Sequence, residues 1–129
     1  MYACKLGHYK LVKLLVENNA KVTARDRFWR TAAMHAAASG HTNILSYLLR
    51  LGADPNVADS SGNTSLHYAC AYGWYHAAKV LIEAGARLNA ANDWKLTPFG
   101  VAFLKGHVGI CDQLLVINKD QIDVNFRLV

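Results

Sequence analysis

The chain carries six histidines and three cysteines, residue types that often bind metals or act as nucleophiles. The histidines are His8, His35, His41, His67, His76 and His107. Zinc sites place their ligands at short, regular spacings, and neither a CxxC nor an HExxH pattern occurs. His35 and His76 have no cysteine or carboxylate at ligand spacing. Structural histidines are therefore favoured over a metal site, and we expect neither a metal nor a cofactor.

The cysteines are Cys4, Cys70 and Cys111, an odd number without paired spacing. This pattern argues against a disulfide framework and favours a reducing compartment, either the cytoplasm or the nucleus. Cys4 and Cys70 fall at positions where a small residue packs between helices, which predicts buried, inert thiols. We expect Cys111 to be partly exposed.

Catalysis has little support in the sequence. No cysteine has an obvious neighbouring base, and the carboxylates are scattered singly. The glycines form no phosphate-binding loop. We therefore expect the protein not to be an enzyme and assign no catalytic residue.

Composition narrows the protein class further. The 129 residues fit one domain, and 53% hydrophobic with 18% charged residues indicates a globular chain. No apolar run approaches the roughly 20 residues that span a bilayer, and the first residues do not resemble a signal peptide. The net charge of +5 favours acidic partners but is too small to indicate nucleic acid by itself.

An internal repeat explains the glycine spacing. Gly7, Gly40, Gly73 and Gly106 are each 33 residues apart. Other positions align in the same register: Thr31, Thr64 and Thr97; Ala3, Ala36, Ala69 and Ala102; Leu11, Ile44, Ala77 and Ile110; Leu15, Leu48, Leu81 and Leu114. So many coincidences at one period predict four copies of one structural unit.

The sequence pattern within each unit predicts two helices and a loop. Thr97 before Pro98 is typical of a helix N-cap followed by proline at the first helical position. Glycine should end this first helix in a left-handed conformation. A second helix follows, with the apolar spacing of Ile44, Leu45, Leu48 and Leu49. Gly52 and Gly85 should end it, and Asn19 and Asn118 take their place in the other copies. The polar segment 56–62 suits a hairpin finger between units.

These motifs resemble the ankyrin repeat family. Its T-P-L-H-x-A signature has counterparts at residues 64–69 and 97–102, with a more divergent copy at 31–36. Its G-A-D-x-N ending has a counterpart in Gly52-Ala53-Asp54-Pro55-Asn56. The resemblance implies an all-α repeat solenoid in which each repeat is a helix-turn-helix with a hairpin finger.

The repeat register divides the single domain, residues 1–129, into successive units. These are a truncated repeat at 1–25, repeats at 26–58 and 59–91, a repeat at 92–125 with a three-residue insertion near its end, and the start of a further finger at 126–129. Met1 aligns with Met34, inside a first helix. We therefore expect the chain to be part of a longer protein.

In the family, partners usually bind a concave surface formed by the fingers and the first helices. The positions of this chain that correspond to that surface are Arg27, Phe28, Trp29, Arg30, Tyr72, Trp94, Lys95, Leu96 and Lys105. Trp29 and Lys95 occupy a finger position where glycine is usual, so each either distorts its turn or serves a contact. Aromatic and arginine residues dominate binding hot spots. We expect this surface to bind a peptide or loop of another protein, with acidic character.

Other functions stay open at this stage. Trp29 and Trp94 could instead pack between fingers, and the domain could be a structural spacer in a longer array. Bases stacked on the aromatic rings, with phosphates on the basic residues, would give a nucleotide or nucleic-acid site. The finger asparagines Asn56, Asn89 and Asn125 resemble sites of asparaginyl hydroxylation in this family, which would make the protein an enzyme's substrate.

Overall fold

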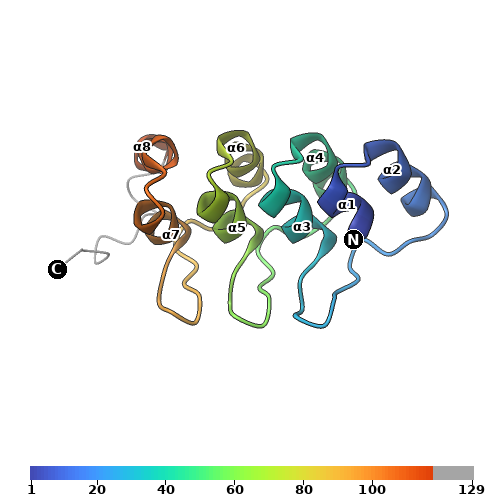
Figure 1. Ribbon diagram of the computed structural model, residues 1–129, viewed down its shortest axis with the longest axis horizontal. Helices are drawn as coiled ribbons and strands as arrows, with labels where there is room; N and C mark the ends of the chain where they lie inside the picture. Colours follow the sequence, from blue (N-terminus) through green and yellow to red (C-terminus); the bar gives the residue numbers. More distant parts are fainter. Residues whose placement is uncertain (118–129) are drawn as a thin grey trace.

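The computed structural model describes residues 1–117 of the chain. Its regular secondary structure consists of helices arranged in pairs, with loops between the pairs. The helices are α1 (Tyr2–Leu6), α2 (Tyr9–Glu17), α3 (Ala32–Ser39), α4 (Thr42–Arg50), α5 (Ser65–Tyr72), α6 (Tyr75–Glu83), α7 (Pro98–Leu104) and α8 (Val108–Ile117). The four pairs lie side by side along the long axis of the molecule (Figure 1). The predicted all-α repeat solenoid is confirmed.

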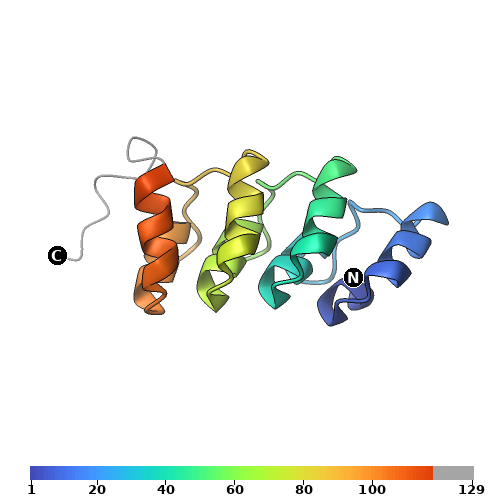
Figure 2. The ribbon, with the colours of Figure 1, turned by 90° about the horizontal axis from the view of Figure 1, so that it is seen from above.

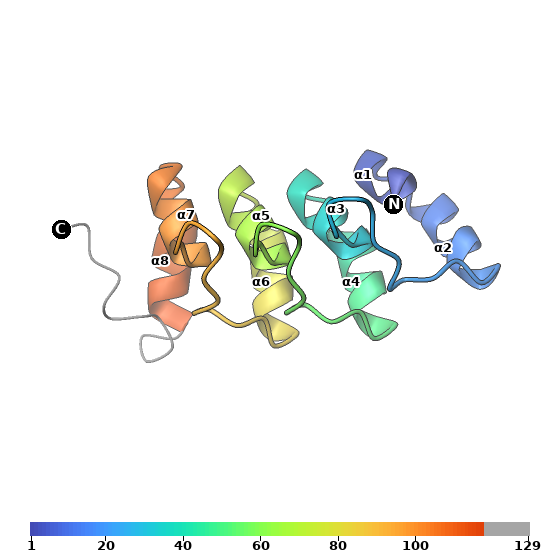
Figure 3. The same cartoon turned by 90° about the horizontal axis from the view of Figure 1, so that it is seen from below.

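The odd-numbered helices form one layer and the even-numbered helices a second layer (Figures 1 and 2). Three long loops, here called fingers, project from the side of the odd-numbered helices. Seen from that side, they stand in a row in front of α3, α5 and α7 (Figure 3). We call the fingers together with the exposed side of the odd-numbered helices the finger surface. The even-numbered helices form the opposite, outer layer.

Threonine begins each complete first helix, as the sequence predicts. The Oγ1 of Thr31 accepts a hydrogen bond from the amide of Met34 at 3.2 Å, and that of Thr97 accepts one from Gly100 at 3.2 Å. Thr64 caps α5 in the same way, through the amide of His67. Such caps satisfy amide groups that have no partner within the helix and contribute about 1 kcal/mol each.

Glycine ends α1, α3 and α5 for two reasons, which Gly40 illustrates. Its φ of 74° lies in the left-handed region. In addition, a Cβ at this position would lie 2.5 Å from Cδ2 of the Trp74 ring, which belongs to the next repeat. The close approach lets the Trp74 indole N–H donate to the carbonyl of Ala38 at 2.8 Å. The ring thereby ties one repeat to the next.

Histidine takes the place of Trp74 at two other junctions. Nε2 of His41 lies 3.1 Å from the carbonyl oxygen of Lys5, and Nε2 of His107 lies 3.1 Å from that of Ala71. These histidines are therefore structural, as the sequence predicts. Trp74 stands at the same position of its repeat, and its indole N–H donates to the equivalent carbonyl, that of Ala38.

Small residues form the core between neighbouring first helices. Ala36, Ala69 and Ala102 are fully buried, so α3, α5 and α7 can approach closely. Cys4 and Cys70 are buried as expected, and burial raises the pKa of the Cys70 thiol, which disfavours the reactive thiolate. The expectation that Cys111 is partly exposed is wrong, because its side of α8 faces the core and it is buried.

Some predictions concern residues outside the described range. The predicted helix end at Asn118, the three-residue insertion, the finger start at 126–129 and Asn125 all lie beyond residue 117. Among the described helices, none is long and apolar enough to cross a bilayer.

Candidate functional site

An acidic or amide side chain organises each finger from within. Oδ1 of Asp26 accepts hydrogen bonds from the amides of Phe28 and Arg30, both at 2.9 Å. Asp59 accepts in the same way from Ser61 and Asn63, and Asn92 from Trp94 and Leu96. The three organising residues are 33 positions apart. Their bonds fix the loop backbone, so the intervening side chains project from a rigid support.

The second oxygen of each carboxylate reaches the adjacent first helix. Oδ2 of Asp26 lies 2.9 Å from Nε of Arg30 and 3.1 Å from Nε2 of His35. Burial alone would raise the pKa of Asp26, but the hydrogen bonds from Arg30, His35 and Phe28 outweigh it and hold that pKa well below its usual range. The Tyr68 hydroxyl donates to Oδ2 of Asp59. Burial, followed by this carboxylate, raises the pKa of Tyr68. These side chains support the surface rather than offering charge to a ligand.

A left-handed residue closes the turn of each finger. Trp29 has a φ of 62° and Lys95 a φ of 65°, while Gly62 occupies the corresponding position with a φ of 80°. All three amides make the same turn bond, as in Trp29 to the carbonyl of Asp26 at 2.9 Å. Trp29 and Lys95 therefore do not distort the turn. They adopt the glycine conformation, which costs an L-residue about 1–2 kcal/mol.

Arginines surround the aromatic rings of the first finger. The guanidinium groups of Arg27 and Arg30 lie 5.2 Å and 5.0 Å from the centre of the Phe28 ring. Arg25 lies 5.3 Å from the Trp29 ring and donates to the carbonyl of Ala58 at 2.8 Å. These distances allow cation–π attraction, which holds the rings in place without burying them.

The neighbouring fingers are joined by backbone hydrogen bonds. The amide of Ser60 donates to the carbonyl of Phe28, and the amide of Asp93 donates to that of Ser61, each at 3.0 Å. Asn92 adds a bond from its side-chain amide to Oδ1 of Asn63 at 2.9 Å. The fingers thus form one continuous support rather than three independent loops.

Most of the predicted binding residues are exposed. The rings of Phe28, Trp29, Tyr72 and Trp94 belong to residues that are 48%, 59%, 60% and 65% exposed. Arg27, Lys95 and Lys105 are exposed, whereas Arg30 and Leu96 are half-buried. If Trp29 and Trp94 packed between fingers, their rings would be covered. Their exposure disfavours that alternative.

A cavity of about 230 Å³ on the finger surface brings two of these predicted residues together. Arg30 and Tyr72 both line it, along with Lys5, Met34, His35, Ala38, Ser39 and Tyr68. The cavity therefore spans α1, α3 and α5 at the base of the first finger. Trp94, Lys95 and Leu96 lie on the third finger, and Lys105 follows α7. The predicted residues thus fall into one cluster around the first finger and another at the far end of the same surface.

Sequence reasoning missed the residues that support this site. Asp26, Asp59, Asn92 and Tyr68 were not predicted to have a role. The 33-residue register contains a signal for the first three, an acid or amide at the start of every finger. Nothing in the spacing indicates that the Tyr68 hydroxyl reaches Asp59.

The finger asparagines differ in their surroundings. The Asn56 side chain donates to the carbonyl of Gly85 at 3.0 Å and accepts from the amide of Arg87 at 2.7 Å. Asn56 therefore links two repeats, and an enzyme would have to displace these bonds to reach it. Asn89 is exposed.

His67 forms the densest histidine contacts. Its Nδ1 accepts from the amide of Thr64 at 3.1 Å, and its Nε2 lies 2.9 Å from the carbonyl oxygen of Leu96 in the next repeat. This pairing fixes the neutral ring with the proton on Nε2. Burial lowers the pKa of His67, and the bond to Leu96 opposes that shift in part. Within residues 1–117, no cluster of three or more histidine, cysteine or acidic side chains could hold a metal ion.

Comparison with known proteins agrees with this architecture. The family model described as ankyrin repeats (3 copies) matches residues 1–92 and 51–127. No curated protein matches the chain. Proteins with these repeats are generally protein–protein interaction modules and typically not enzymes. With the paired helices, capping threonines and rows of fingers, this match places the chain in the ankyrin repeat family.

Proposed function

We propose that this domain binds an acidic peptide or exposed loop of another protein through its finger surface. The observation that carries the proposal is Trp29, an exposed tryptophan held in a left-handed turn. Gly62 makes the same turn in the next finger, so the turn itself needs no side chain. Trp29 is 59% exposed and recovers little of the conformational cost by burial. Strain of this kind clusters at functional sites, which supports a role in contact.

The charges of the finger surface support an acidic partner. Arg27 is exposed beside Phe28, and Lys5 is exposed where it lines the cavity. The carboxylates of Asp26 and Asp59 are engaged by groups of the protein itself. Their charge is therefore partly compensated, and among the described residues Arg27, Lys95 and Lys105 have no carboxylate partner. Asp93 is also exposed on the third finger, so these three cations outnumber the one exposed carboxylate beside them. A positive surface speeds the approach of an acidic segment and selects against basic ones.

A display library of random peptides, selected on the purified domain, tests the proposal. We expect the enriched peptides to be rich in Asp and Glu and to lose at least about tenfold in affinity for the double variant Trp29→Gly, Trp94→Ala. Leu11→Ala is the control, because Leu11 is an exposed apolar residue on α2, in the outer layer. Enriched peptides without acidic bias, or with equal affinity for the double variant, would contradict the proposal.

A nucleotide or nucleic-acid ligand is the second candidate, because exposed aromatic rings beside arginines could stack bases. Two of the arginines near these rings are already engaged, however. Arg25 donates to backbone carbonyls and Arg30 pairs with Asp26. The remaining exposed cations do not form a continuous stripe, because Arg27 lies on the first finger and Lys95 on the third. A phosphate backbone needs such a stripe, whereas an acidic peptide needs only isolated contacts, which favours the protein partner.

Hydroxylation of Asn56, Asn89 or Asn125 is a separate proposal. It rests on the resemblance of these sequence positions to the finger asparagine that is hydroxylated in other members of the family. Peptide mass spectrometry of the protein isolated from its own cells tests it, and unmodified asparagine at all three positions would contradict it.

A further inference from the structure

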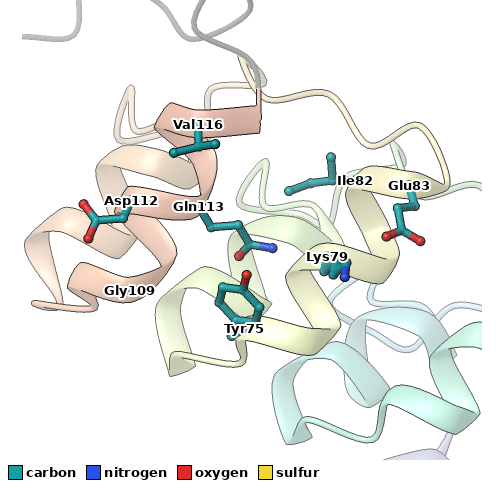
Figure 4. Close-up of a pocket in the computed structure, with 8 residues that line it drawn as sticks. All are labelled: Tyr75, Lys79, Ile82, Glu83, Gly109, Asp112, Gln113 and Val116. Atoms are coloured by element: carbon teal, nitrogen blue, oxygen red, sulfur yellow. The ribbon is translucent and has the colours of Figure 1, made fainter.

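A groove lies between α6 and α8 of the outer layer (Figure 4). Figure 1 shows that these two helices lie on the side away from the fingers. Its volume is about 550 Å³, and its lining is mainly apolar. Tyr75, Lys79 and Ile82 line it from α6, and Gly109, Gln113 and Val116 line it from α8. Hollows of this size commonly accommodate ligands when a few polar groups converge in them.

Gln113 is the polar group that sets this groove apart. Gln113 is only 7% exposed, yet neither its Nε2 nor its Oε1 has a hydrogen-bond partner among the described residues. Figure 4 shows its side chain reaching from α8 into the space toward Tyr75 and Lys79. A buried amide without partners destabilises a protein, so natural structures rarely keep one.

The repeat register shows that Gln113 and Gly109, which line the groove from α8, have no counterparts of the same type in the other repeats. The positions that align with Gln113 hold Leu14, Tyr47 and Val80, which are apolar or aromatic. Those that align with Gly109 hold Lys10, Asn43 and His76, all with side chains. A Cβ on Gly109 would meet nothing within 4 Å. Gly109 therefore leaves its side of the groove open, and the groove contains an amide where the other repeats place an apolar or aromatic group.

The neighbouring groove between α4 and α6 provides an internal comparison. It has a volume of about 490 Å³ and is lined by Thr42, His76, Lys79, Val80 and Glu83. Val80 stands there at the Gln113 position, and none of its lining residues has a buried polar atom without a partner. A hollow between outer helices thus recurs, but the unpartnered amide does not.

We propose that the α6–α8 groove is a second docking site, which binds a peptide segment through an apolar side chain and one backbone amide group. A glutamine side chain offers an acceptor oxygen and donor hydrogens, which complement the N–H and C=O of a peptide group. Ile82, Val116 and the Tyr75 ring provide apolar surface for the side chain. Lys79 flanks the groove with a positive charge, and Glu83 and Asp112 flank it with negative charges, so the site selects against an acidic residue.

The probe for a test is N-acetyl-leucine N-methylamide, a capped residue with one apolar side chain and free amide groups. Titration into the full ¹⁵N-labelled chain should give saturable chemical-shift changes confined to residues 75–83 and 109–116. The fully N-methylated analogue keeps the leucine side chain but has no N–H to donate to Gln113, so it should bind more weakly. Trp29→Gly should leave these shifts unchanged, which separates this site from the finger surface.

Two variants complete the test. Gln113→Leu keeps the size of the side chain and removes the amide, and it should weaken binding of the probe about tenfold. The same change should raise the thermal midpoint by about 4 °C, because it removes an unpaired buried amide. Gly109→Leu fills the groove and should abolish the shifts while the helix content, measured by circular dichroism, is retained.

Three results would overturn the proposal. The first is the absence of saturable shifts at the groove, and the second is equal affinity of the probe for Gln113→Leu and the unchanged chain. The third is a set of nuclear Overhauser effects from the Gln113 side-chain amide to residues 118–129 in the free chain. That result would mean that the chain fills its own groove.

Discussion

Substitution of Lys95 tests whether the left-handed turn residues are strained. Lys95 has a φ of 65° and is exposed, so replacement by alanine or glycine removes little packing. Alanine keeps the conformational cost of the left-handed region, about 1–2 kcal/mol, whereas glycine relieves it. Glycine also makes the unfolded chain more flexible, which destabilises the fold by about 0.4–1 kcal/mol. The free energy of unfolding should therefore be higher for Lys95→Gly than for Lys95→Ala by about 0.5–1 kcal/mol.

Urea unfolding followed by circular dichroism measures this difference in free energy. In thermal unfolding, the midpoint temperature of Lys95→Gly should lie about 2–4 °C above that of Lys95→Ala. Gly62→Ala is the reverse control. A Cβ at Gly62 would lie 3.0 Å from Cα of Asn92 and from Oδ1 of Asp93, so strain and crowding act together. We expect that variant to lose at least about 1 kcal/mol. Equal stability of Lys95→Gly and Lys95→Ala would refute the argument from strain, including its use for Trp29.

Further predictions follow from the junctions between repeats. Trp74→Phe removes the N–H that Ala38 accepts and should cost about 0.5–1.5 kcal/mol in the free energy of unfolding, whereas Trp74→His should retain most of that stability. Asn56→Ala should cost about 1–2 kcal/mol, and Asn56→Asp, which keeps the acceptor for Arg87, should cost less; equal losses would be inconsistent with the two bonds observed. His67 has a lowered pKa in the folded state, so the unfolded chain binds more protons, and stability should decline as the pH falls from about 6.5 toward the folded pKa. Denaturation midpoints between about pH 7.5 and pH 5.5 measure this, and the dependence should flatten in His67→Gln. Affinity for a selected acidic peptide should weaken only moderately with salt, while a steep loss would favour a phosphate-rich ligand.

Local rules of helix geometry made most of the fold predictable. Threonine caps at Thr31, Thr64 and Thr97 and glycine at the helix ends each depend on a few neighbouring residues, so the sequence contains the information. Asn19, predicted to end a second helix, has a φ of 73°. The burial of Cys111 was also predictable, since Val12, Leu45 and Ala78 align with it and are all buried.

Contacts across repeats were harder to predict. The hydrogen bond from Trp74 to Ala38 joins residues 36 positions apart, and no spacing rule within one repeat contains it. The same is true of the unpartnered Gln113, because its burial depends on how α8 packs against α6. For the finger surface, the sequence identified exposed aromatic and basic side chains. It did not identify the carboxylates of Asp26 and Asp59, which position those side chains through backbone amides.

Chemical-shift mapping of a library-selected acidic peptide on the ¹⁵N-labelled chain tests most directly whether the finger surface binds an acidic partner. We predict the largest shifts at residues 27–30, at Tyr72 and at residues 94–96, together with the indole N–H signals of Trp29 and Trp94. Shifts confined to the outer helices α2, α4, α6 and α8, with both indole signals unmoved, would contradict the claim.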